Sequence, residues 1–238
     1  MKVKILHLYY DIMNLYGEYG NLKILEKHLK DQGLDVEIEK KTISDNANLD
    51  DYDFIYMGAG TEKNQIFILE DMKTKYKQSM KKAIDDGKII LLTGNSYEVL
   101  GKSINGKEAL EIFDFETKIG ENRITSDIIA KSDILDNKVI GFVNNMSQIN
   151  GNNIPLFEIE FGATENKESS KEGIIYNNLI GTHLIGPILT KNPEILKMFV
   201  EKICNQKDEN FNYKEINYEY EEKAYKIALE QLELRKQK

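Results

Sequence analysis

The chain has 238 residues, which suits one large domain or one domain with an appendage. Its net charge of -8 argues against a nucleic-acid-binding surface, because phosphate binding needs clustered Lys and Arg. A single cysteine, Cys204, excludes an internal disulfide, and no apolar run approaches the roughly 20 residues that span a bilayer, so we expect a cytoplasmic protein without a transmembrane segment.

The first half of the chain alternates apolar strands with amphipathic helices. Apolar runs rich in β-branched and aromatic residues predict strands at 3–10, 53–57 and 88–92, and a more alternating run predicts one at 36–42. Helical spacing predicts one helix before Gly33, through Leu22, Leu25 and Leu29. It predicts a second before Gly87, through Leu69, Met72, Tyr76, Met80 and Ala83. This order predicts an α/β fold with an open, mostly parallel sheet flanked by helices.

The second half is predicted to be rich in β-structure and to end in helices. Short β-like segments between polar turns are expected at 114–119, 128–134, 138–143, 157–161 and 173–184. The polar stretch 163–171 is expected to be an exposed loop, and Pro193 is expected to open a helix that runs to about Asn205.

A polar break at 206–213 separates this body from a charged C-terminal helix at 215–238. The helix carries an apolar stripe at helical spacing, made of Tyr225, Ala228, Leu229 and Leu232. We therefore expect a main domain at 1–205 and a linker with a charged helix at 206–238. Packing of this helix on its own domain is favoured over docking to a partner.

Three loops are candidates for a functional site, because ligands in open α/β sheets bind at the carboxyl ends of the strands. They follow the strands predicted at 3–10, 53–57 and 88–92. In the second loop, Gly58-Ala59-Gly60 can present backbone N–H groups to an anion or an oxyanion, although such a loop is as often only a tight turn. The third, at 93–97, has the strand–turn–helix order of a nucleophile elbow.

The tip of this elbow offers three residues, Gly94, Asn95 and Ser96. A serine nucleophile needs a nearby base. His7 lies in the first predicted strand and His28 on a helix, so both are expected to be structural, which leaves His183. No acidic residue ends the third strand, which excludes a receiver-like site, and no spacing of His, Cys and Asp matches a metal-ligand set.

Four segments together carry a resemblance to a known family. They are Asp11-Ile12-Met13-Asn14-Leu15-Tyr16 with Gly20-Asn21, Gly58-Ala59-Gly60-Thr61 with Gln65, Tyr97-Glu98-Val99-Leu100-Gly101, and Gly181-Thr182-His183-Leu184-Ile185-Gly186-Pro187-Ile188-Leu189. The chain resembles the GatD-type subunits of lipid II isoglutaminyl synthase, within the CobB/CobQ-like class I glutamine amidotransferases, from residue 3 to about 205. The resemblance implies a class I glutamine amidotransferase-like, flavodoxin-like domain over residues 1–205.

The resemblance also implies substrate-binding groups. Asn122-Arg123-Ile124-Thr125 is similar to a family segment whose arginine helps to hold substrate glutamine. The glycine loop is similar to the family's oxyanion loop, and Asn95 stands beside the elbow tip. The implied binding residues are Arg123, Gly58, Ala59, Gly60 and Asn95.

The chain departs from the family at both halves of the catalytic dyad. The family places Cys where this chain has Gly94 and His where it has Ile185, and often His where Asn145 stands. In the family's reaction the thiolate attacks the amide carbon and His accepts and returns the proton. Glycine has no side chain and isoleucine cannot titrate, so no catalytic residue is intact and we expect a pseudo-glutaminase.

The resemblance further implies a partner, because a GatD-type subunit supplies ammonia to a Mur-ligase-like subunit, MurT, that amidates the D-glutamate of lipid II. We expect a non-catalytic partner or regulator of such a ligase in peptidoglycan amidation, with no cofactor. Two alternatives stay open. In the first, catalysis has relocated to Ser96 with His183. In the second, the chain binds glutamine or another amine as a sensor through Arg123 and the 58–60 loop.

Overall fold

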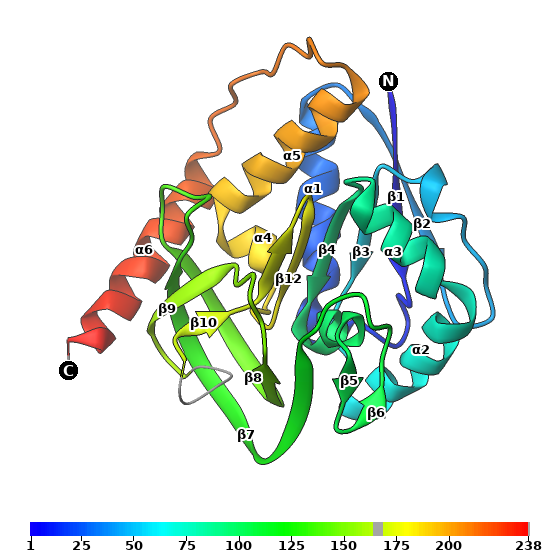
Figure 1. Ribbon diagram of the computed structural model, residues 1–238. Helices are drawn as coiled ribbons and strands as arrows, with labels where there is room; N and C mark the ends of the chain where they lie inside the picture. The colour runs from blue at the N-terminus through cyan, green and yellow to red at the C-terminus, as the bar shows by residue number, and fades with distance from the viewer. Residues whose placement is uncertain (164–168, 238) are drawn as a thin grey trace.

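The computed structural model describes residues 1–163 and 169–237, which form two sheets with helices around them (Figure 1). Most of the loop predicted at 163–171 lies outside the described residues. Within the described ranges, no helix combines the length and the apolar character that crossing a membrane requires.

The main sheet has six strands in the order β11-β12-β4-β3-β1-β2. All neighbouring pairs are parallel except β11 with β12. The central strands β3 and β4 are buried at every residue, which explains their unbroken apolar sequences. The prediction of an open, mostly parallel sheet is therefore confirmed. Its strands are β1 (Lys2–Leu8), β2 (Asp35–Lys41), β3 (Phe54–Met57), β4 (Ile89–Thr93), β11 (Ile174–Tyr176) and β12 (Leu179–Thr182).

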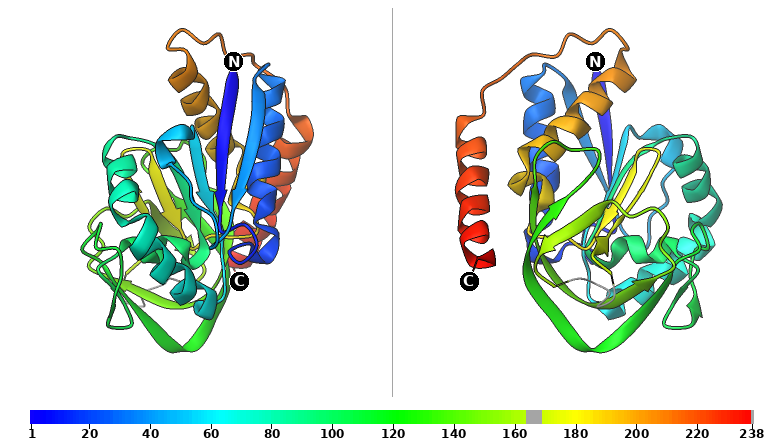
Figure 2. Two further views of the ribbon diagram at one scale, coloured as in Figure 1. Left: turned by 90° about the vertical axis from the view of Figure 1, so that its right-hand side faces the viewer. Right: turned by 60° about the vertical axis from the view of Figure 1, so that its left-hand side comes forward.

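Helices cover both faces of the main sheet. They are α1 (Tyr19–Asp31), α2 (Glu62–Lys75), α3 (Lys77–Asp85), α4 (Ile188–Lys191), α5 (Pro193–Lys207) and α6 (Glu219–Lys236), with 3-10 turns η1 (Leu15–Gly17), η2 (Leu49–Asp51) and η3 (Gly94–Leu100). Successive side chains of β1 point to opposite faces. Val3 and Ile5 therefore lie in the core beneath α1 and α5, whereas Leu6 and Leu8 lie in the core beneath α2 and α3. Figure 2 shows the helices on the two faces of the main sheet.

The second helical stripe forms two helices instead of the predicted one. The chain breaks at Tyr76, whose φ of -123° is not helical. The Tyr76 hydroxyl accepts a hydrogen bond from the Ala47 N–H at 3.2 Å, so the break brings this side chain to the loop before η2. Gly33 and Gly87 follow α1 and α3 with φ of +88° and +76°, which agrees with their prediction as helix stops.

A second sheet, in the order β10-β9-β7-β5-β6 with β8 also paired to β7, occupies the other half of the molecule. Its strands are β5 (Ser103–Ile104), β6 (Lys107–Glu108), β7 (Glu116–Lys131), β8 (Val139–Asn150), β9 (Phe157–Phe161) and β10 (Lys171–Glu172). The β-rich second half is thus present, and the segment predicted at 157–161 matches β9.

Two boundaries in this half differ from the prediction. The segments expected at 114–119 and 128–134 belong to one long strand, β7, because the polar residues 120–123 form an irregularity in its pairing with β8 and not a turn that ends it. The segment expected at 173–184 is a hairpin, in which Asn177 adopts a φ of +51° between β11 and β12. The polar residues at 177–178 were the available signal for that turn.

The C-terminal helix is present but begins at Glu219, not at Glu215. It packs against α4, α5 and β7 of its own chain, and its predicted apolar stripe is half-buried. No residue of α6 is fully buried. The division of the chain near residue 205 stays a prediction.

Candidate functional site

The loops that follow β1, β3 and β4 meet at the carboxyl edge of the main sheet, as predicted. The glycine loop packs tightly beneath the first loop. A Cβ on Gly60 would lie 2.2 Å from the Met13 Sδ, and a Cβ on Gly58 would lie 2.7 Å from the Met13 carbonyl oxygen. The Leu15 N–H also donates to the Ala59 carbonyl at 2.9 Å. Close packing against Met13 is therefore the physical reason for both glycines.

The third loop has the geometry of an elbow. β4 ends at Thr93, Gly94 adopts a φ of +63°, and η3 follows at once. A nucleophile elbow holds its tip residue in this kind of strained turn. A Cβ built on Gly94 would lie 2.4 Å from the Ala59 Cβ, closer than real Cβ atoms approach. The methyl group of Ala59 thus fills the space that a side chain at position 94 would need.

Ile185 faces the elbow from the opposite side. It follows β12, is 1% exposed, and its N–H donates to the Phe142 carbonyl of β8 at 2.9 Å. The Cβ built on Gly94 would lie 3.4 Å from the Ile185 Cγ2. The structure therefore brings the two positions of the implied dyad together, with an apolar side chain at one and none at the other.

One N–H of the glycine loop, that of Gly60, already donates a hydrogen bond within the chain. The Gly60 N–H donates to the Asn95 Oδ1 at 3.0 Å, and Asn95 is 8% exposed. An oxyanion hole needs such a donor left free for the developing negative charge. Asn95 therefore occupies one of the loop's N–H groups, that of Gly60, with its own side-chain carbonyl.

The space left between these loops is small. The cavity has a volume of about 10 Å³, roughly the room that one water molecule needs. Larger cavities, of about 440 and 430 Å³, lie beside α6, away from this edge of the sheet. The small cavity is lined by Tyr16, Ala59, Gly60, Glu62, Gly94, Asn95, Asn144, Asn145, Met146, Ser147, His183 and Ile185.

Arg123 lies at the rim of this cavity with its charge already paired. Its Nη2 is 2.5 Å from the Glu62 Oε1, and its Nη1 donates to the Asn144 Oδ1 at 3.1 Å. Both partners line the cavity. A substrate carboxylate would have to displace Glu62 to reach the guanidinium, so the predicted binding role of Arg123 stays a proposal.

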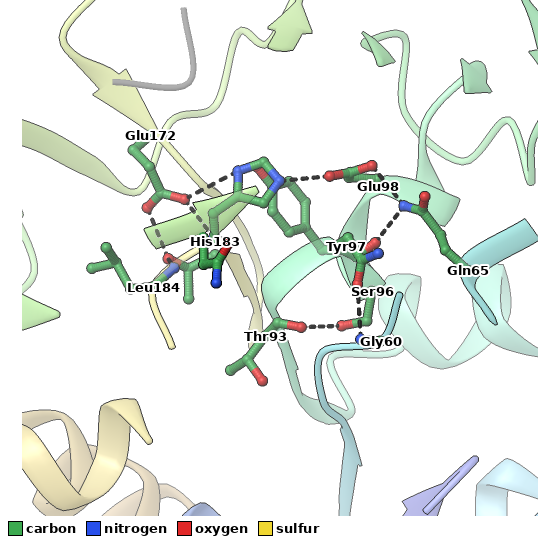
Figure 3. Close-up of polar contacts among 12 residues, drawn as sticks. Gly60, Gln65, Thr93, Ser96, Tyr97, Glu98, Glu172, His183 and Leu184 are labelled. Atoms are coloured by element: carbon green, nitrogen blue, oxygen red, sulfur yellow. Dashed lines mark hydrogen bonds and ion pairs between the residues drawn. The ribbon is translucent and has the colours of Figure 1, made fainter. Parts of the chain in front are cut away.

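His183 is held between carboxylates beneath the cavity (Figure 3). Its Nε2 lies 2.7 Å from the Glu98 Oε1, its Nδ1 lies 3.1 Å from the Tyr97 hydroxyl, and its backbone N–H donates to the Glu172 Oε1 at 2.6 Å. Gln65 donates to the other oxygen of Glu98 at 2.6 Å. All of these side chains are buried, so each ring nitrogen of His183 serves a buried polar network.

Ser96 points into its own turn. Its hydroxyl, which has one proton, lies 2.8 Å from the Thr93 carbonyl and 3.0 Å from the Met57 carbonyl. Both partners accept hydrogen bonds, so neither can act as a base. The structure thus does not bring Ser96 and His183 together as a nucleophile and its base, because the hydroxyl closes the turn after β4 and His183 pairs with Glu98.

The other two histidines lie elsewhere. His7 is fully buried among tyrosine rings, and burial with the nearby Lys40 charge lowers its pKa to about 4. His28 stacks on Tyr218, and its Nε2 lies 2.8 Å from a Glu221 carboxylate oxygen. Both therefore have packing roles, and His28 joins α1 to α6. Across the described part of the chain, no group of three His, Cys, Asp or Glu residues is placed to hold a metal ion.

Sequence reasoning missed Glu18, a buried acid behind the elbow. Its carboxylate accepts hydrogen bonds from the Thr93 hydroxyl, from the Tyr56 hydroxyl at 3.2 Å and from the Gly186 N–H at 2.9 Å. Burial raises the pKa of Glu18. This side chain joins the first loop, the end of β4 and the turn after Ile185. One acid between a strand and a helix has no sequence pattern that marks it as buried.

Solved structures place the fold in a class. The chain superposes on the PurLQS structure from Thermotoga maritima with a TM-score of 0.56, at 14% identity, over 87% of this chain and 100% of that one. It superposes on a glutamine amidotransferase of the same organism with a TM-score of 0.52, at 11% identity, over 98% and 93%. The fold is therefore that of a class I glutamine amidotransferase.

Sequence comparison gives the family. Residues 4–193 match the CobB/CobQ-like glutamine amidotransferase domain. The chain is 33% identical over 234 residues to the GatD subunit of the glutamine-hydrolysing lipid II isoglutaminyl synthase of Staphylococcus aureus, covering 96% of each chain. It is 27% identical to the Streptococcus pneumoniae GatD subunit, covering 87% of this chain and 82% of that one. The chain belongs to the CobB/CobQ-like glutamine amidotransferase family and, within it, to the GatD type.

Proposed function

We propose that this chain is a GatD-like subunit without glutaminase activity that serves as partner or regulator of a Mur-ligase-like, MurT-type enzyme in peptidoglycan amidation. The observation that carries the proposal is the methyl group of Ala59, which fills the space of a side chain at Gly94. A cytoplasmic location is part of the proposal, in keeping with a single cysteine that excludes an internal disulfide.

Glutamine hydrolysis by this fold needs a nucleophile, a base, a free oxyanion donor and room for the substrate. Gly94 offers no atom to attack the amide carbon, and Ile185 cannot accept or return a proton. The Gly60 N–H is bonded to Asn95. The cavity of about 10 Å³ has no room for an amino acid. Nucleophile, base and room for the substrate are missing at one place, and one oxyanion donor is occupied, which supports loss of the reaction more strongly than either substitution alone.

A retained scaffold supports a role as a subunit. Both curated relatives carry the name of a subunit of lipid II isoglutaminyl synthase, and the first covers almost the whole chain. The buried Glu18 still joins three segments around the vacated site through hydrogen bonds. A surface that a partner protein recognises depends on the arrangement of these three segments. That arrangement can persist when the catalytic residues are lost. Such a complex would take its nitrogen from free ammonium.

The test is a complex with the MurT-type ligase encoded in the same genome, purified after co-expression. Ammonia release from glutamine is measured for the chain alone and for the complex, and ligase amidation is measured with glutamine and with ammonium chloride. We expect no ammonia above the uncatalysed background and amidation only with ammonium. Failure of the two proteins to form a complex would refute the subunit role.

Two results would favour the alternatives. Glutamine hydrolysis at an ordinary enzyme rate that disappears in Ser96→Ala would establish relocated catalysis with His183. Tight binding of glutamine by the isolated chain, lost in Arg123→Ala, would establish a sensor. In the second case Glu62 must release Arg123, so a Glu62→Gln variant should bind glutamine more tightly than the native chain.

A further inference from the structure

The helix α6 has two apolar faces. Its inner face rests on the body of the protein through half-buried side chains that include Tyr225, Ala228 and Leu232. Polar contacts fix it there. The Tyr225 hydroxyl donates to the Lys138 carbonyl at 2.6 Å. The Arg235 Nη1 lies 2.6 Å from the Asp127 Oδ2. The helix is thus held in place without a single buried residue.

The outer face carries a second stripe. Tyr220 is 86% exposed, Ile227 is 51% exposed and Leu234 is 49% exposed. The three are seven residues apart, and a helix turns through about 100° per residue, so they line one side. Ile227 lies about 160° around the helix from Tyr225, so this stripe faces away from the body. Figure 2 shows α6 on one flank of the molecule with its outer side open.

An outward apolar stripe is unusual on a surface helix, whose solvent face is normally polar. Two charged residues beside the stripe, Lys223 and Glu230, form no ion pair within the ranges that the structure describes. On the opposite, inner side of α6, Ile216, 36% exposed, lines the 440 Å³ cavity between this helix, α5 and the loop before β8.

We infer that the outer stripe of α6, made of Tyr220, Ile227 and Leu234, docks into an apolar groove of the ligase subunit, with Lys223 and Glu230 pairing opposite charges at its edges. This inference rests on the proposed function and names the surface through which it operates. The mode is a helix laid in a groove, in which anchors repeat along one face of the helix.

The size of the stripe selects a large partner over a second copy of this chain. Fourteen residues of helix extend about 21 Å, and the stripe is one side chain wide. A specific interface buries about 1,200 to 2,000 Å² in total, which two such stripes crossing each other do not reach. A ligase groove can cover the stripe together with the charged side chains of Lys223 and Glu230 beside it. The match to the Staphylococcus aureus subunit extends into α6, because the unmatched share of the chain is shorter than this helix, so part of the helix is shared with a chain that bears the name of a subunit.

The experiment compares the double variant Ile227→Glu, Leu234→Glu with Gln237→Glu, a control that adds a carboxylate at the C-cap of the same helix, beyond the stripe. Affinity of each full-length chain for the purified MurT-type ligase is measured by titration calorimetry, and thermal unfolding checks that both variants fold like the native chain. We expect the double variant to bind at least tenfold more weakly and the control to bind within twofold of the native chain.

Three other results overturn the inference. If the native chain and the double variant bind the ligase equally, the surface is wrong while the subunit role stands. If the native chain does not bind at all, the subunit role fails and the inference with it. If ultracentrifugation detects a native dimer that the double variant abolishes, the stripe belongs to a second copy of this chain.

Discussion

The substitution Gly94→Cys should destabilise the protein and leave it inactive, because position 94 has neither the backbone conformation nor the space for a side chain. A residue with a Cβ at a φ of +63° costs about 1–2 kcal/mol. The new Cβ would lie 2.4 Å from the Ala59 Cβ, and overpacking of this kind costs about 1–3 kcal/mol. The sum is roughly 2–5 kcal/mol, which lowers the melting temperature of a chain this size by roughly 4–20 °C.

The substitution Ala59→Gly isolates the steric part of this cost. Alone, it should destabilise the protein by about 0.5–1 kcal/mol through lost backbone restriction. Combined with Gly94→Cys, it should recover about 1–3 kcal/mol relative to the sum of the single changes, which a double-mutant cycle measures by thermal or urea unfolding. A Gly94→Cys variant as stable as the native chain, or a cycle without coupling, would refute the reasoning from Ala59.

Glutaminase activity should require more than a thiol at position 94. A thiol at position 94 without a base has an ordinary pKa of about 8.5 and is only a few per cent thiolate at neutral pH. Room, nucleophile and base return together only in the triple variant Ala59→Gly, Gly94→Cys, Ile185→His. Ammonia release from glutamine by Gly94→Cys alone would mean that a residue already present, most simply His183, serves as base.

Two further predictions concern buried titratable groups, each read from urea unfolding at a series of pH values. The pKa of His7 is lowered to about 4, so the unfolded chain binds this proton first and the native state should lose about 3 kcal/mol as the pH falls from 6.5 to 4. A His7→Phe variant should lose less over that range, and equal losses would contradict the assignment. The pKa of Glu18 is raised, so its stabilising contribution is complete below its ordinary value of 4.5 and is lost as the pH rises through the higher folded value. A Glu18→Gln variant should therefore fall less in stability than the native chain over this rise, and a parallel fall would argue against a raised pKa for Glu18.

The layout of the fold could be predicted because buried strands and helix faces produce local apolar patterns in the sequence. β3 and β4 read as apolar runs, since both faces of each strand are covered. The break at Tyr76 produces no such pattern, because the five stripe residues are buried whether one helix or two carry them. Likewise, the polar residues inside β7 looked like a turn. Only the pairing of the residues on either side of them with β8 keeps the strand continuous there.

The location of the site could be predicted from the sequence, but the atoms that fill it could not. The resemblance located Gly94 and Ile185, and the fold brings them to one place. What fills the space between them depends on residues far apart in the chain. The loop Gly58-Ala59-Gly60 was predicted as an anion-binding loop, but its Gly60 N–H donates to Asn95. The methyl group of Ala59 fills the space of a side chain at position 94. No local pattern contains that information. The partners of Glu18 are likewise separated from it by up to 168 positions.

The contact between Ala59 and Gly94 also restricts the order in which this site can change. A methyl at 59 and a side chain at 94 cannot occupy the same space in this arrangement, so a nucleophile gained at 94 requires that Ala59 is replaced or that the glycine loop shifts. A change at 94 alone therefore passes through a destabilised intermediate, which selection removes. Under the proposed function, the surface of this chain can diversify far more easily than its site can gain the chemistry.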